Sequence, residues 1–167
     1  LALPGDRPPP ARASARGRVH AFPIPAPLGE RIGELARASD TTVFAPLFAA
    51  WQLLLARWAG CDDVVIGTLV AGRERGELEG LVGCFINLAT LRFDCDPARS
   101  YRDWLVETRR VVVAAEARTD IPHDQLAEEL RACGAAMPEV AVIFSDSSRR
   151  DRLSFGGLTL TRMARGE

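Results

Sequence analysis

Few side chains in this sequence combine a type and a spacing that could support catalysis. The only two histidines are His20 and His123, and neither stands beside a nucleophile in a recognised catalytic arrangement. A general base must first lie within reach of its substrate. His123 is expected on the first turn of a helix, so we interpret it as a surface residue. His20 has no stronger claim to a catalytic role.

Metal and nucleotide sites find little support in the sequence. Gly67, Gly72 and Gly83 match the spacing of neither dinucleotide-binding nor P-loop motifs, and the chain contains no lysine to complete a P-loop. No two cysteines form a Cys-x-x-Cys pair, and both histidines are distant from them, so we expect no metal site. We expect free thiols, as in a reducing cytosol, at all four cysteine positions: Cys61, Cys84, Cys95 and Cys133.

The amide of Asn87 is the most informative polar group, because it stands in an otherwise apolar segment. It offers both a donor and an acceptor, while Gly83 allows close backbone approach. Two readings stay open: Asn87 contacts a ligand, or it satisfies a neighbouring backbone group. Strand alternation from 86 to 93 places Asn87 and Arg92 on opposite faces, which predicts a surface or salt-bridge position for Arg92.

Short apolar runs bounded by glycine or proline predict buried strands at 19–24, 64–70, from 82 onward, 140–144 and 153–161. Helical periodicity predicts helices at 28–38, 42–59, 100–115 and 122–132. Asp40, Thr41 or Thr42 is expected to cap the second helix, which is apolar nearly all round and so predicted to be central. Ser100 and Asp103 form a capping box for the third. This order predicts an α/β fold, with a mixed, mostly buried sheet flanked by helices.

Length and charge narrow the class of protein. A chain of 167 residues suits one domain, and its net charge of −1 offers no field to attract nucleic acid. We expect no membrane span, because the longest apolar stretch, 43–58, is short and contains Pro46 and Arg57. No signal peptide is recognised, so we expect a cytoplasmic location. Residues 1–16, rich in Pro, Arg and Ala, read as a linker or strap.

Several segments, in order, resemble the condensation domains of nonribosomal peptide synthetases. These are LPGDRP at 3–8, GTLVAGR at 67–73, GCFIN at 83–87 and RTDIPHDQL at 118–126. The last departs from the family pattern at Arg118 and His123, where the family usually has His and Phe. The resemblance implies one lobe of a chloramphenicol acetyltransferase-like fold. It assigns 1–16 to an inter-lobe linker and 17–167 to an incomplete C-terminal subdomain.

The resemblance also implies which residues matter. Gly83, Phe85 and Asn87 are expected to line the cleft between two lobes. The family's His-His-x-x-x-Asp-Gly signature is absent from this sequence, so we expect no catalytic residue here and no amide-forming activity from this chain alone. A helix-start role is favoured for Asp120, where the dipole suits a carboxylate. Structural roles are expected for six motif residues: Gly67, Thr68, Gly72, Arg73, Asp120 and Pro122.

By the same resemblance, the partners are peptidyl carrier proteins and the N-terminal lobe of the same domain. The phosphopantetheine arm is carried by those carriers, and this chain is expected to bind no cofactor itself. Two alternatives remain open. One is an O-acyltransferase that uses CoA or a carrier thioester. The other is a non-catalytic module that recruits carrier or tailoring proteins, which the departures at Arg118, His123 and Met137 allow. The sequence leaves open the substrates, the donor or acceptor side and the oligomeric state.

Overall fold

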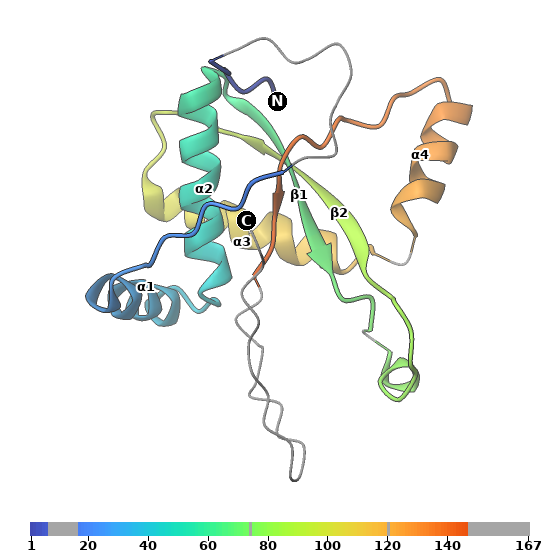
Figure 1. The fold of residues 1–167 in the computed structure, drawn as a ribbon, viewed down its shortest axis with the longest axis horizontal. Coiled ribbons are helices and arrows are strands. Elements are labelled where there is room, and N and C mark those ends of the chain that lie inside the picture. The colour runs from blue at the N-terminus through green and yellow to red at the C-terminus, as the bar shows by residue number, and fades with distance from the viewer. Residues whose placement is uncertain (7–16, 74, 120, 147–167) are drawn as a thin grey trace.

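The computed structural model describes residues 1–6, 17–73, 75–119 and 121–146. Within them a three-stranded sheet has the order β2-β1-β3 (Figure 1). Strands β1 (Asp63–Val70) and β2 (Asn87–Asp94) are antiparallel, whereas β3 (Ile143–Phe144) runs parallel to β1. The helices are α1 (Ala26–Ala38), α2 (Phe44–Ala59), α3 (Tyr101–Glu116) and α4 (His123–Ala132), and a short 3-10 turn, η1, spans Gly76–Leu78. The predicted mixed α/β architecture is confirmed.

The core lies between one face of the sheet and the two long helices α2 and α3. Alternate residues of β1 and β2 point into it, as strand geometry requires. Trp104 of α3 and Phe48 of α2 are its largest fully buried side chains. The rest of this cluster is Leu55, Ala56, Val64, Ile66, Leu91, Phe93, Cys95 and Val112. Burial of this continuous apolar surface fixes the position of the sheet relative to both helices.

Helix α3 starts where the sequence predicts. The Ser100 hydroxyl accepts the Asp103 amide hydrogen at 3.3 Å and donates to the Asp103 carboxylate at 2.6 Å. Thr108, on the same face as Trp104, donates to Gln52 of α2 at 3.2 Å inside the core. The N-cap role of Ser100 is confirmed, but the capping box is only half formed, because the Asp103 carboxylate accepts from the Ser100 hydroxyl and not from its backbone N–H.

Other boundaries differ from the predictions. Residues 19–24 do not form a strand, because no strand among the described residues pairs with them; Val19 and Phe22 are exposed. Helix α2 has Val43 at its N-cap and no side-chain cap, so the predicted polar caps are wrong. This helix is central, but one side is open, with Leu54 and Trp58 more than half exposed.

The remaining strands are shorter than predicted. Residues 82–86 form a loop, and β2 begins only at Asn87. Strand β3 contains two residues instead of the predicted 140–144. The strand predicted at 153–161 lies outside the described residues. Among the helices that the structure describes, none is long and apolar enough to cross a membrane.

Candidate functional site

The loop between β1 and β2 joins two of the sequence motifs through direct contacts. Gly72 adopts a left-handed backbone conformation, with φ of +62°, and a Cβ there would lie 2.1 Å from the Phe85 carbonyl oxygen. Glycine is therefore required both by conformation and by space. The Arg73 guanidinium donates to the carbonyl of Leu78 and, at 2.9 Å, to that of Gly83. It also lies 4.4 Å from the centre of the Phe85 ring, a cation–π geometry.

These contacts connect the two ends of the loop. Arg73 reaches from the end of β1 to the far side of the loop, so the start of β2 is held in place. Phe85 is half-buried beneath that guanidinium, whereas Gly83 is exposed. Gly67 and Thr68 lie one step earlier, inside β1. A Cβ at Gly67 would come within 2.7 Å of a Val140 methyl carbon and 2.9 Å of a Leu88 methyl carbon, so any larger side chain would require these neighbours to shift.

Asn87 fastens the start of β2 to the start of α4. Its side-chain nitrogen donates to the carbonyl oxygens of Thr119 at 3.2 Å and Ile121 at 2.8 Å. Its side-chain oxygen accepts from the backbone N–H groups of Leu88 and His123, each at 2.9 Å. An amide offers two donor hydrogens and two acceptor lone pairs. All four are therefore used, and every partner is a backbone group.

A groove of about 500 Å³ opens beside Asn87, along the outer edge of β2. We call it the β2 groove. Residues of β2, α3 and α4 and of the segment before β3 line it. The walls are mostly apolar and include Val111 of α3 and Leu126 of α4. None of the described lining residues is acidic, and the charged ones are Arg92, Arg110 and Arg118.

Two buried polar atoms in this groove have no hydrogen-bond partner within the described part of the chain. They are the Thr90 hydroxyl oxygen and the Nδ1 atom of His123. Unsatisfied buried polar atoms are uncommon and call for an explanation. The His123 ring is half-buried, so the predicted surface position is only partly correct. His123 contacts Asn87 through its backbone N–H and not through its imidazole.

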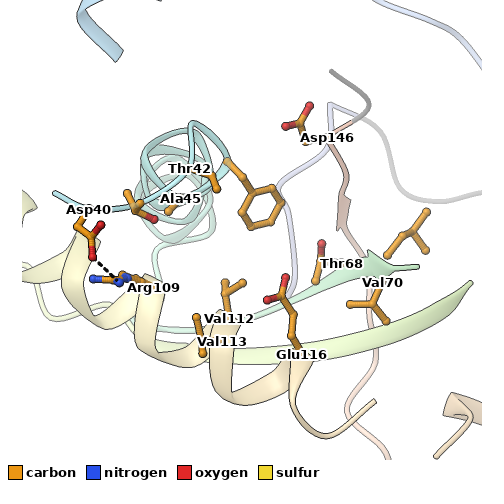
Figure 2. A pocket seen from close by; sticks show the side chains of 13 residues that line it. Asp40, Thr42, Ala45, Thr68, Val70, Arg109, Val112, Val113, Glu116 and Asp146 are labelled. Atoms are coloured by element: carbon orange, nitrogen blue, oxygen red, sulfur yellow. Dashed lines mark hydrogen bonds and ion pairs between the residues drawn. The ribbon is translucent and has the colours of Figure 1, made fainter. Parts of the chain in front are cut away.

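A second cavity, of about 550 Å³, lies between the start of α2, the end of β1 and α3. Figure 2 shows the Thr68 and Glu116 side chains directed toward the same space. At one end Arg109 donates to Asp40 at 2.9 Å, a pair whose acid is almost fully exposed and therefore contributes little stability. Thr68 itself is buried, at 5% exposure.

The ionisable groups with displaced pKa values are not arranged as an acid–base pair. The hydrogen bond from Arg92 holds the pKa of Asp63 below its ordinary value, and Arg110 does the same to the pKa of Glu107. Arg92 is thus the surface ion-pair residue that strand alternation predicted, 2.7 Å from Asp63. Burial raises the pKa of the Cys95 thiol to about 12. The described residues contain no cluster of metal-ligating side chains.

The structure thus brings together most of the residues that the motifs single out. Gly72, Arg73, Gly83 and Phe85 meet in the β1–β2 loop, and Asn87 follows directly. Pro122 is the N-cap of α4, whereas Asp120 lies outside the described residues. Sequence reasoning missed the tie between Asn87 and the start of α4. The only feature of the sequence that pointed to this contact was the presence of two family-like segments, 83–87 and 118–126, in one chain.

Comparison with known proteins identifies the class. The condensation domain family model matches residues 1–145, and this chain belongs to that family. A linear gramicidin synthase of Brevibacillus parabrevis is 42% identical over 130 residues, which are 78% of this chain. Phosphinothricin tripeptide synthetase PhsC of Streptomyces viridochromogenes is also 42% identical, over 77% of this chain.

A solved structure extends the comparison to the fold. The X-domain in its complex with OxyB from teicoplanin biosynthesis superposes with a TM-score of 0.70 at 26% identity, over 83% of this chain. The chain spans only a small part of these proteins. It covers 2% of the gramicidin synthase, 12% of the phosphinothricin synthetase and 30% of the X-domain structure.

Proposed function

We propose that this chain forms the C-terminal half of a condensation domain that joins a carrier-bound acyl thioester to a carrier-bound amine. Its role is to supply one wall of the cleft in which the two substrates meet. The observation that carries this proposal is the β1–β2 loop. Contacts among Gly72, Arg73, Gly83 and Phe85 join its two ends next to Asn87, which supports a role in positioning.

The chemistry requires alignment, the handling of one proton and stabilisation of charge on the developing oxyanion. The described residues suit the first of these tasks. A rigid loop limits the positions available to a tethered substrate, and alignment alone can lower a barrier by roughly 7–11 kcal/mol in favourable cases. The amide of Asn87 is fully engaged with backbone groups, so it positions the wall and does not handle the proton.

Proton handling therefore falls to the N-terminal lobe in this proposal, where the family's paired histidines stand. The phosphopantetheine arms enter as parts of the substrates, carried by peptidyl carrier proteins, and no cofactor resides in this half. The protein needs no nucleophilic side chain, because the amine itself attacks the thioester carbonyl and the thiol leaves with the proton that the amine loses.

The test is reconstitution with loaded carriers. This chain alone should form no amide above the buffer rate, while the same chain joined to an N-terminal lobe that contains the paired histidines should do so. In the joined protein, Arg73→Ala should lower the rate by roughly ten-fold or more through loss of alignment. Arg57→Ala, on an exposed part of α2, is the matched control. Turnover by the isolated chain would refute the proposed division of roles.

Recruitment of another protein is a second candidate function. The observation that favours it is the similarity to the X-domain, which is described in complex with OxyB, together with the departures at Arg118 and His123. In this case the joined protein would bind a carrier or tailoring protein measurably and form no amide. The reconstitution assay, run beside a binding assay, separates the two functions.

A further inference from the structure

The outer edge of β2 has unpaired backbone groups. The Cys95 N–H donates to the Asp62 carbonyl, so Asp62 and Cys95 form a hydrogen-bonded antiparallel pair one residue beyond the end of the β1–β2 ladder. Hydrogen-bonded and non-bonded pairs alternate along antiparallel strands. Thr90 and Arg92 therefore turn their N–H and C=O groups away from β1. Gly67 lies opposite Thr90 and fits the same alternation, because its N–H points away from β2 and donates to the Val142 carbonyl on the β3 side.

No strand among the described residues pairs with that edge (Figure 1). The Leu88 N–H, which also faces outward, is satisfied by the Asn87 side chain, so the open stretch begins at Thr90. An exposed edge of this kind is a template for a further strand. Natural proteins usually cover such an edge or protect it with charges, and here Arg92 is the one charged residue on the open stretch before Asp94.

The β2 groove runs beside the same edge and is shaped for side chains. Val111 and Ala115 of α3 line it together with Ile121 and Leu126, and the volume is about 500 Å³. The unpartnered Thr90 hydroxyl lies within it. A strand added to β2 would place alternate side chains into this groove. It would also bring polar backbone groups within reach of that hydroxyl.

The charge of the groove selects among possible segments. Its described lining contains three arginines and no acid, in a chain whose net charge is −1. Arg92 and Arg110 each pair with a carboxylate outside the groove. Arg118 donates to the Ala114 carbonyl, and no carboxylate partner for it occurs among the described residues. The groove therefore favours a segment that carries negative charge.

We propose that the β2 groove binds an extended acidic peptide segment of a partner protein, which adds to β2 as a fourth strand. The backbone of that segment pairs with Thr90 and Arg92. Its small apolar side chains occupy the groove, and one of its carboxylates meets Arg118. Main-chain bonds provide affinity and alternate side chains provide specificity in this mode of recognition. The inference does not depend on the condensation activity proposed above.

The first test measures binding of a defined probe to the full chain. The probe is a fluorescein-labelled, end-capped heptapeptide in which glutamate alternates with valine, followed by fluorescence anisotropy. We expect saturable binding that weakens with salt, as charge contacts require. The same peptide with lysine in place of glutamate should not bind. Arg118→Glu should weaken binding at least about five-fold, whereas Arg57→Glu, an exposed arginine outside the groove, should change it less than about two-fold.

The second test distinguishes strand addition from simple charge attraction. Amide hydrogen exchange is measured with and without saturating peptide. The amides of Thr90 and Arg92 should slow at least about ten-fold on binding, whereas those of Ala89 and Leu91, already bonded to β1, should not change. This readout uses the unmodified chain, so it does not depend on whether a variant folds.

Three results would overturn the proposal. The first is the absence of binding up to about 1 mM, which is weaker than any useful docking contact. The second is binding without protection of Thr90 and Arg92, which would mean charge attraction only. The third is strong protection of both amides in the free chain, which would mean that the chain's own residues outside the described part already cover this edge.

Discussion

The tie made by Asn87 predicts that one substitution will loosen α4 without unfolding the core. No residue of α4 is fully buried, so packing alone holds this helix weakly. Asn87→Ala removes four hydrogen bonds, to Thr119, Ile121, Leu88 and His123. A typical bond contributes about 1 kcal/mol net. Because the side chain is only half-buried, water replaces part of the loss, and we expect about 2–3 kcal/mol of lost stability.

Asn87→Asp separates the donor bonds from the acceptor bonds. It keeps the oxygen that accepts from Leu88 and His123, but it turns a carboxylate oxygen toward the carbonyls of Thr119 and Ile121. Like-sign partial charges then face each other, so its effect should equal or exceed that of alanine. Gln125→Glu makes the same change of amide to acid on the exposed face of α4 and serves as the control.

The assay combines urea unfolding with amide hydrogen exchange. In Asn87→Ala the amides of α4 should exchange faster than those of α3, because α4 detaches before the core opens. The Gln125→Glu control should match the parent chain in both measurements. If Asn87→Ala stays within about 0.5 kcal/mol of the parent and α4 exchange is unchanged, the fastening role of Asn87 is wrong.

Three further predictions address other contacts. Gly72→Ala would set a methyl carbon 2.1 Å from a backbone carbonyl oxygen at φ of +62°, so it should destabilise the β1–β2 loop by at least about 1–3 kcal/mol, measured by urea unfolding. Ser100→Ala removes the cap that accepts from the Asp103 amide and should cost about 1 kcal/mol in the same measurement. The pKa of Cys95 is raised from 9.0 to about 12, so its neutral thiol favours folding. The stability that the neutral Cys95 thiol contributes should be fully present below pH 9 and be lost as pH rises from 9 to 12. At pH 8 the alkylation of Cys95 should be much slower than that of the exposed Cys84, and equal rates would contradict the burial of Cys95.

The elements that the sequence predicts well are those stabilised by their own residues. The N-cap of Ser100 requires only local contacts, and the face that carries Trp104 follows from helical periodicity. Strand β1 is recognisable for the same reason, as a short apolar run between glycines. In each case the deciding residues are close in sequence, so periodicity and spacing contain the information.

The segment from Val19 to Ile24 fails for the opposite reason. Its apolar residues resemble those of a strand, but a strand needs a neighbour to accept its hydrogen bonds. Nothing in a local pattern reports whether that neighbour exists. The late start of β2 has a similar cause, because residues 82–86 are held by Arg73 and Gly72, ten or more positions earlier, in a loop conformation.

The contacts of Asn87 also could not be predicted from local sequence, because they join residues far apart in the chain. The segments at 83–87 and 118–126 are separate signals in the sequence, and each predicts its own role: Asn87 for the cleft, Pro122 and Asp120 for a helix start. In space the Asn87 amide binds the backbone on both sides of Pro122, 32–36 residues away. The two segments are therefore one structural unit. Because that amide has no free donor or acceptor, a substrate could form a hydrogen bond with it only by displacing one of these backbone partners, and an Asn87 variant that alters catalysis should also alter α4 exchange.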